Sequence, residues 1–419
     1  MIDYELHTLP NGLRVAANRD RRSKLAAVSI LYKVGARDES PERTGFAHLF
    51  EHLMFRGTQR VPDFDAPVQM ACGETNAFTN NDYTDFYMTL PTANLPLALW
   101  LEADRMTGLD IDGAKLDAEK RVVVEEFKER YLNRPYGDMT MLMRSLAYRV
   151  HPYRWSTIGL SPEHIAGASL EEVRSFYRRH YRPSNAVLAV SADIEPERIF
   201  ALAEESFSHI ASDPDAGDTL YIYKGRPQEP PQTEARRMEV ERDVPATVVT
   251  LAFHIGGRMS RDFFLGDLVS DLLAGGESSR LYNDLVKGRK LFSSVNAYVT
   301  GETEPGLFVF TGELLTSVDP AAGEAAFWDE IARLQNEAAG EYELEKVRNK
   351  FEANAAFGEL NVLNKALNLC IYDAIGDLSL INREVGIYRS LGAGDIIDFS
   401  RRIFTREGCS TLIYKSAER

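Results

Sequence analysis

Apolar residues follow two different periods along the chain, and each period predicts one type of element. Residues 24–34 form an aliphatic run that favours a β-strand, and residues 45–55 carry apolar side chains at helical spacing. This pattern predicts a strand that leads into a helix. Helical spacing returns at residues 117–131 and 170–181, and residues 185–190 again favour a strand. Because helices and strands alternate, the expected class is α/β or α+β.

The length of the chain and one polar stretch predict a division into two domains. At 419 residues the chain is longer than a usual single domain. A polar, proline-rich stretch without hydrophobic periodicity spans residues 224–237 and is the best candidate for a linker. We therefore expect a first domain at 1–225, a linker at 226–237 and a second domain at 238–419.

The two halves of the chain resemble each other in sequence. Residues 176–181 and 399–404 both begin with Phe, carry two arginines and precede a run that favours a strand. Residues 28–32 resemble residues 249–253, and the two pairs are separated by nearly the same number of residues. This agreement predicts an internal duplication. The alternative is chance, because short helix and strand patterns often look alike.

The composition of the chain argues against nucleic acid and anionic membranes as partners and against a thiolate metal site. The chain has 48 basic and 63 acidic residues, and a net charge of −15 opposes nonspecific attraction to nucleic acid or to an anionic membrane. No apolar run of about 18 residues is present, so we expect no membrane span. Three scattered cysteines, Cys72, Cys370 and Cys409, do not suit a thiolate site, so any metal must be bound by histidine and carboxylate.

The start of the chain shows no leader pattern, with no charged segment followed by an apolar run. This absence and the few cysteines suit a bacterial cytoplasmic protein. A leader that had been removed would suit a periplasmic one.

Residues 48–52 have the pattern His-x-x-Glu-His inside the predicted helix 45–55. On a helix, His48 and His52 lie one turn apart on one face, and Glu51 lies beside them. Zinc binds imidazole nitrogen, and a catalytic zinc site has three protein ligands and an open fourth position. The alternative is a pair of core histidines, which is disfavoured by the free-energy cost of burying two polar rings. We expect a zinc site whose third ligand comes from another segment.

The predicted helix 117–131 offers two carboxylates for that third ligand. Glu119 and Glu126 are seven residues apart, so two turns of helix place both on one face. Val122 and Val123 would face the core, which puts these carboxylates at the edge of a buried surface. One could bind the metal while the other orients a ligand, and spacing leaves open which does which.

These residues resemble the M16 or pitrilysin-like peptidases, whose zinc motif is the inverted form of the inverzincins. The family includes insulin-degrading enzymes and mitochondrial processing peptidases, and the chain is similar to half-length M16B-type chains of the mitochondrial processing peptidase beta type. The spacing from His52 to Glu126 is close to that of the family. The resemblance covers nearly the whole chain, with matching blocks at residues 9–15, 45–58, 73–79, 84–87, 151–153 and 158–159.

The resemblance implies a fold and a role for each candidate residue. It implies two homologous domains, each a mainly antiparallel sheet covered by helices, which together form half of a clamshell around a peptide-sized chamber. It implies one zinc ion per chain, with His48, His52 and Glu126 as ligands and Glu119 as a carboxylate that supports them. Glu51 is then the general base that takes a proton from zinc-bound water and returns it to the leaving amine.

The resemblance also implies where a peptide substrate binds. The strand that contains Asn76 and Ala77 is similar to the sheet edge on which an extended peptide is added in the family. Main-chain hydrogen bonds would hold such a peptide without requiring one sequence. The alternative for Asn76 is a turn residue, since Gly73, Asn80 and Asn81 are turn formers nearby.

The second half departs from the zinc motif and from self-sufficient members of the family. Asp267, Ser270 and Asp271 stand where the first half has its two histidines and Glu51, so we expect no second zinc site. Self-sufficient members carry an Arg, and a Tyr seven residues later, that reach the substrate. Val286 and Ser293 stand at those positions. Lys287, Arg289 and Tyr298 are near them, but none keeps the spacing from Arg to Tyr.

The resemblance therefore implies a partner. In two-subunit members of the family one chain carries the zinc motif and a homologous chain carries the Arg and Tyr. We expect this chain to be the zinc-bearing subunit of a heterodimer, with a homodimer as the second option. A noncatalytic scaffold or peptide-binding subunit is the competing function, but such homologues usually lose their ligands. A structural zinc site would give Glu51 no role.

Overall fold

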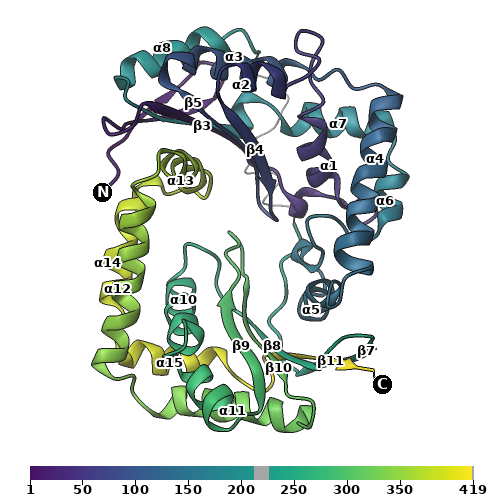
Figure 1. Ribbon diagram of the computed structural model, residues 1–419, viewed down its shortest axis with the longest axis vertical. Coiled ribbons are helices and arrows are strands. Elements are labelled where there is room, and N and C mark those ends of the chain that lie inside the picture. Colours follow the sequence, from purple (N-terminus) through teal and green to yellow (C-terminus); the bar gives the residue numbers. More distant parts are fainter. Residues whose placement is uncertain (212–225, 418–419) are drawn as a thin grey trace. The chain divides into compact units, whose positions relative to one another are not determined.

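The computed structural model describes residues 1–211 and 226–417, and within them the chain forms two compact α/β units (Figure 1). Neither unit is one continuous stretch of chain. Unit 1 takes its described residues from Met1–Glu129, Trp155–Pro227 and Ala356–Asn382, and unit 2 from Arg130–Arg154, Gln228–Ala355 and Arg383–Arg419.

Unit 1 is built on a six-stranded sheet. Its strands are β1 (Glu5–Thr8), β2 (Arg14–Arg19), β3 (Leu25–Tyr32), β4 (Glu74–Thr79), β5 (Thr84–Pro91) and β6 (Ala186–Ala192). Their order is β1-β2-β6-β3-β5-β4. β2 and β6 are parallel, and the other neighbouring strands are antiparallel. Within the described residues β4 therefore lies at an edge of the sheet, with β5 as its one neighbouring strand.

Helices cover both faces of this sheet. α3 (Leu95–Thr107) and α8 (Pro196–Phe207) pack on one face, and α13 (Val362–Ala374) packs on β3 and β6 from the other (Figure 1). Every residue of β3 after Leu25 is consequently buried. A strand that is covered on both faces reads as a continuous apolar run, which is how the sequence reads at this point.

Polar contacts fix α13 to the sheet although it comes from the second half of the chain. Lys365 forms a buried ion pair with Asp20, and Asp373 accepts two hydrogen bonds from Arg14, at 2.5 and 2.8 Å. The thiol of Cys370 donates to backbone carbonyls of β3 and β6 at 3.3 Å. Removing one partner of a buried ion pair costs about 3–5 kcal/mol, so these contacts hold the helix in one register.

The remaining elements of unit 1 connect its strands. They are η1 (Ala36–Asp38), α1 (Phe46–Leu53), α2 (Asp65–Met70), η2 (Thr92–Asn94), α4 (Gly113–Phe127), α6 (Pro162–Ala166), α7 (Leu170–His180), η5 (Pro183–Asn185) and η7 (Leu378–Asn382). A π-helical turn, η3 (Lys128–Leu132), continues α4 to the boundary between the units.

Unit 2 repeats the same plan with five strands. They are β7 (Arg236–Arg242), β8 (Val248–His254), β9 (Phe292–Val299), β10 (Leu307–Leu314) and β11 (Cys409–Ser416). Their order is β7-β11-β8-β10-β9, and only the β7–β11 pair is parallel. This is the order and pairing of unit 1 without β1, so the predicted duplication is confirmed. Residues 28–32 and 249–253 lie in the equivalent strands β3 and β8.

Helical elements pack on this second sheet as well: α5 (Met139–Ala147), α10 (Arg261–Ala274), the π-helical η6 (Tyr282–Gly288) and α11 (Pro320–Asn336). The remaining helical elements are η4 (Pro152–Arg154), α12 (Glu341–Gly358), α14 (Glu384–Ser390) and α15 (Ala393–Ile403). No helix among residues 1–211 and 226–417 is long and apolar enough to cross a membrane.

The elements predicted from periodicity all form. They are β3, α1, α4, α7 and β6. α4 begins earlier than periodicity predicts, at Gly113, because the side chain of Asp112 accepts the N–H of Lys115 and caps the helix. The expected fold class of two homologous α/β domains with mainly antiparallel sheets is confirmed.

The expected linker lies where the described chain resumes. The first two residues of the polar stretch 224–237, which precede the expected linker, lie outside the described residues. Arg236 and Arg237 are already in β7, two residues before the expected second domain, because they pair with β11. The domain boundaries at 1–225, 226–237 and 238–419 otherwise stay a prediction.

Candidate metal centre

The helix α1 presents the His-x-x-Glu-His motif and has an unusual cap at its N-terminus. Its N-cap residue is Gly45, with a φ of 92° and no side chain. The carboxylate of Glu39 takes the place of a cap, because its two oxygens accept the N–H groups of Gly45 and Ala47 at 2.8 Å each. The apolar face of α1 is buried, which leaves His48 and His52 on the face toward α4.

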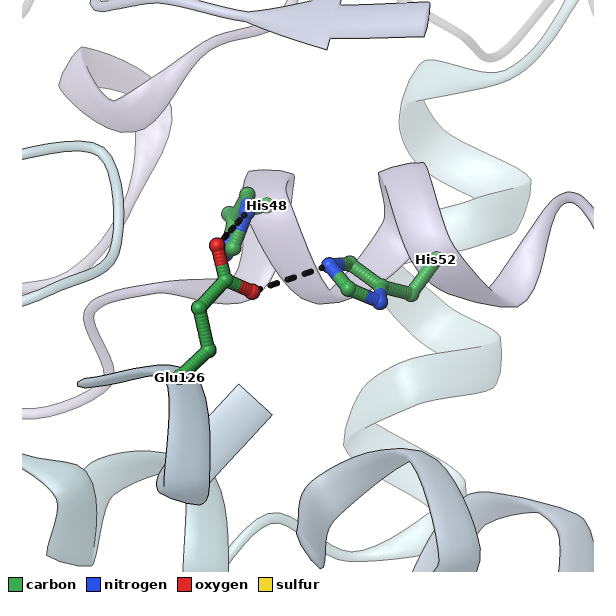
Figure 2. Close-up of side chains that lie close together, drawn as sticks. All are labelled: His48, His52 and Glu126. Atoms are coloured by element: carbon green, nitrogen blue, oxygen red, sulfur yellow. Dashed lines mark ion pairs between the residues drawn. The ribbon is translucent and has the colours of Figure 1, made fainter. Parts of the chain in front are cut away.

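Glu126 on α4 lies between the two histidines. Its Oε1 is 3.7 Å from Nε2 of His48, and its Oε2 is 3.3 Å from Nε2 of His52. Figure 2 shows the carboxylate pointing at both imidazoles. One ligand atom from each of the three residues lies within 4.8 Å of the others. The structure thus brings together the three residues that the sequence predicts as metal ligands.

This geometry fits a zinc ion. Neighbouring ligand atoms in a tetrahedral site with bonds of about 2.0–2.1 Å lie about 3.3 Å apart. Each imidazole Nε2 lies close to that distance from one oxygen of Glu126, at 3.3 Å from Oε2 for His52 and 3.7 Å from Oε1 for His48. Two imidazole nitrogens and one carboxylate oxygen are also a ligand set that catalytic zinc uses.

Glu119 contacts the other nitrogen of His52. Its Oε2 lies 3.6 Å from Nδ1 of His52, and its other oxygen forms an ion pair with Arg56. The side chain of Glu119 is only 1% exposed. Burial acts to raise the pKa of Glu119, but the hydrogen bonds and charges of His52 and Arg56 outweigh it and lower that pKa. Glu119 is therefore an ionised support for His52.

Two carboxylates act on the protonation of His52. Burial acts to lower the pKa of the imidazole, but Glu119 and Glu126 outweigh burial and raise that pKa to about 9. The same carboxylates that stabilise a proton on the imidazole would also stabilise a metal cation bound to it. The proton and the cation compete for the same imidazole nitrogen. The negative charge around His52 therefore favours a bound cation.

The carboxylate of Glu51 contacts the edge strand β4. The hydroxyl of Thr79, the last residue of β4, donates to Oε2 of Glu51 at 2.6 Å. The carboxylate of Glu51 thus lies between α1 and the edge strand. Burial and the charges of Asp85 and Glu51 raise the pKa of Tyr87, a residue on the neighbouring strand β5.

Asn76 and Ala77 both lie in β4, the edge strand. Asn76 is exposed, and Ala77 is buried. The turn alternative for Asn76 is wrong, because Asn76 pairs with Tyr87 in the middle of an antiparallel ladder. The family resemblance predicted this strand, whereas periodicity did not reveal it. The role of both residues in binding substrate stays a prediction.

Arg56 and Thr79 are the site residues that the sequence reasoning missed. Arg56 follows His52 by four residues, so helical spacing could have placed it beside Glu119. Thr79 lies at the end of the block 73–79, where only the approach of β4 to α1 gives its hydroxyl a role.

The equivalent positions of unit 2 are occupied by other contacts. Tyr388 donates to Asp267 at 2.5 Å, and Lys350 pairs with Asp271 at 2.8 Å. Ser270 donates to the backbone carbonyl of Asp267. Asp267 and Asp271 thus attach α10 to α14 and α12, whereas Ser270 bonds within α10 itself.

Asp267 makes the stability of unit 2 depend on pH. Burial, helped by the nearby acids Asp271 and Glu384, raises its pKa to about 6 against the hydrogen bond from Tyr388 and the charge of Arg258. A raised carboxyl pKa gives stability that is complete below the unfolded value and is lost as pH rises through about 6.

We therefore expect Asp267→Asn to gain about 1 kcal/mol of stability relative to the native chain as the pH rises from 5 to 8. The amide keeps the oxygen that accepts from Tyr388 and cannot ionise. The free energy of unfolding in urea at both pH values measures this change. A difference between the two proteins that is the same at both pH values would contradict the prediction.

Val286 and Ser293 lie in η6 and β9, and neither brings a guanidinium or phenol to its position. Lys287 and Arg289 are engaged in exposed ion pairs, at 3.7 Å with Glu277 and 2.9 Å with Asp329. The described residues of η6 thus offer no Arg and Tyr at the family spacing.

The repeated α/β fold and the His-His-Glu cluster are typical of a metal-dependent hydrolase. Two family descriptions match the chain. "Insulinase (Peptidase family M16)" matches residues 14–159, which contain the whole cluster, and "Peptidase M16 inactive domain" matches residues 167–351.

Known relatives agree with those matches. The chain is 30% identical over 390 residues to the zinc protease PqqE of Helicobacter pylori, covering 92% of this chain and 82% of that one. It is 25% identical over 313 residues to a probable mitochondrial-processing peptidase subunit beta of Arabidopsis thaliana, covering 72% and 57%. The crystal structure of a protease from Helicobacter pylori matches with a TM-score of 0.93 at 27% identity, covering 99% of this chain and 100% of that one. The chain therefore belongs to the M16 peptidase family, and the predicted resemblance is confirmed.

Proposed function

We propose that this chain is a zinc-dependent endopeptidase subunit that hydrolyses extended peptides. The cluster of His48, His52 and Glu126 next to Glu51 is the observation that carries the proposal. Zinc bound by the three ligands would polarise the scissile carbonyl and lower the pKa of the attacking water. One zinc ion per chain is expected, because unit 2 uses the equivalent positions for ion pairs.

Three other residues of the site have separate roles in the proposed reaction. Glu51 accepts the proton of the attacking water and returns it to the leaving amine, so no covalent intermediate is needed. Glu119 faces Nδ1 of His52, which keeps Nε2 directed at the ligand cluster. Arg56 holds Glu119 ionised and in place.

The edge strand β4 supports binding of an extended peptide. In the part of the chain that the structure describes, β4 pairs with β5 on one side only, so the N–H and C=O groups on its other side are positioned to pair with an added strand. Asn76 and Ala77 lie in the middle of this strand. The same strand ends at Thr79, which contacts Glu51, so a peptide on β4 would run toward the general base.

Removal of zinc tests the proposal. We expect the purified chain, with its partner where one is required, to hydrolyse an internally quenched peptide, to lose that activity in a chelator and to recover it when zinc is restored. Activity that survives complete removal of metal would contradict the proposal. A chain that binds zinc and peptide but hydrolyses no peptide with any partner would instead be a noncatalytic subunit.

The absence of Arg and Tyr at positions 286 and 293 supports a requirement for a homologous partner that supplies them. We expect the chain alone to have little activity and a mixture with such a homologue to gain at least about tenfold in kcat. Peptide hydrolysis measured with each chain alone and with both tests this expectation. Full activity of the isolated chain, at a concentration where it is monomeric, would contradict it, and full activity of a homodimer would favour the second option.

A further inference from the structure

Thr79 connects the proposed peptide-binding strand to the proposed general base. Side chains alternate along a strand, so Ala77 and Thr79 lie on the same face of β4. That face is turned toward α1, since Ala77 is buried there and the hydroxyl of Thr79 donates to Oε2 of Glu51 at 2.6 Å. A hydroxyl has one proton to donate, and Thr79 gives it to this carboxylate.

The backbone that carries Thr79 is held firmly. The side chain of Asn80 accepts the N–H groups of Asp82 and Tyr83, which closes the turn between β4 and β5. The carbonyl of Asn80 accepts the N–H of Ala36 at 3.1 Å. A Cβ on Gly35 would lie 2.5 Å from the backbone of this turn, so the approach is close.

This turn and α1 are anchored to the same segment of chain. Ala36 and Arg37 bond to the turn through their backbone N–H groups, and Glu39, two residues further on, caps the N-terminus of α1. The separation between Thr79 and Glu51 is therefore set by backbone contacts at both ends. These contacts fix the direction of the Thr79 hydroxyl toward the carboxylate of Glu51.

We propose that Thr79 is a positioning residue for the general base, an inference that rests on the proposed function. A carboxylate turns about its last carbon–carbon bond, and a hydrogen bond to Oε2 stops that rotation. Oε1 then keeps one direction, from which it takes the proton of the attacking water and later returns it to the leaving nitrogen. Thr79 keeps its own proton throughout. Because β4 also holds the peptide, one element sets the position of both substrate and base.

Thr79→Val tests the proposal, because valine has the shape of threonine without the hydroxyl. We expect kcat to fall about tenfold, with KM and zinc affinity within about twofold of the native values. Thr79→Ser restores a hydroxyl and is expected to recover most of kcat. Thr107→Val is the matched control, since the hydroxyl of Thr107 donates to a helix carbonyl in α3. Native kcat in Thr79→Val, or an equal loss in Thr79→Ser, would overturn the proposal.

A second measurement does not use activity. The hydrogen bond predicts that Thr79→Val and Glu51→Ala are coupled, so their effects on the urea midpoint are smaller together than the two single effects added. Additive effects would overturn the proposal. The two variants can be coupled even if the native chain binds zinc but hydrolyses no peptide with its partner. That result would show that the hydrogen bond forms, but that the proposed function is wrong and with it the catalytic part of this inference.

Discussion

Glu51→Gln is expected to leave zinc bound and to lower kcat at least about 100-fold. The amide cannot accept the proton of the attacking water, whereas its size and its carbonyl oxygen preserve the contact with Thr79. The three ligand side chains are unchanged, so the zinc content and the affinity for peptide are expected to stay near native values. Hydrolysis of an internally quenched peptide and metal analysis of the same sample measure both parts of this prediction.

Glu205→Gln is the matched control for that substitution, because it removes the same charge from an exposed position of α8. It is expected to keep native activity. A Glu51→Gln protein that retains more than about a tenth of the native kcat would exclude Glu51 as the general base. A Glu51→Gln protein without zinc would show that Glu51 acts on the metal site itself.

The helix that carries the histidines could be predicted because its signals are local. Apolar spacing over residues 45–55 predicted α1, and a separation of four residues placed His48 and His52 on one face. Both conclusions depend only on the geometry of one helix. The structure bears them out, with the two imidazole rings 4.9 Å apart.

Helical spacing alone could not assign separate roles to Glu119 and Glu126. Seven residues place both on one face of α4, but about 10.5 Å apart along its axis. Both reach His52 because the two nitrogens of one imidazole point in different directions. Glu126 faces Nε2 of both histidines, whereas Glu119 faces Nδ1 of His52. Only the packing of α4 against α1 determines this division.

Contacts between distant segments account for what the sequence reasoning missed. α13 lies in the second half of the chain, yet Lys365 and Asp373 fix it to the sheet of unit 1. The hydrophobic periodicity of α13 predicts a helix with a buried face, but it does not predict which sheet that face packs against. The same holds for Thr79, whose hydroxyl gains a partner only when β4 folds back beside α1.

Glu126→Gln is expected to weaken zinc binding by more than about 100-fold and to abolish hydrolysis at limiting zinc. Losing a residue that supports a ligand costs about 10–100-fold in metal affinity, and losing a direct ligand costs more. The change also removes the negative charge between two imidazole nitrogens, at 3.3 and 3.7 Å. Competition with a zinc-binding dye measures the affinity, and the fold is checked by thermal unfolding of the zinc-free chains.

Glu125→Gln provides a control at the next position of the same helix. Its side chain is 70% exposed and pairs with Lys128 at 2.6 Å, so it points away from the histidines. Both variants change the net charge by the same amount, and long-range electrostatics alone would weaken zinc binding about equally in each. We expect Glu125→Gln to bind zinc with native affinity. Equal losses in the two variants, or native affinity in Glu126→Gln, would mean that Glu126 is not a ligand, and the third position of the site would then have to be sought in another carboxylate.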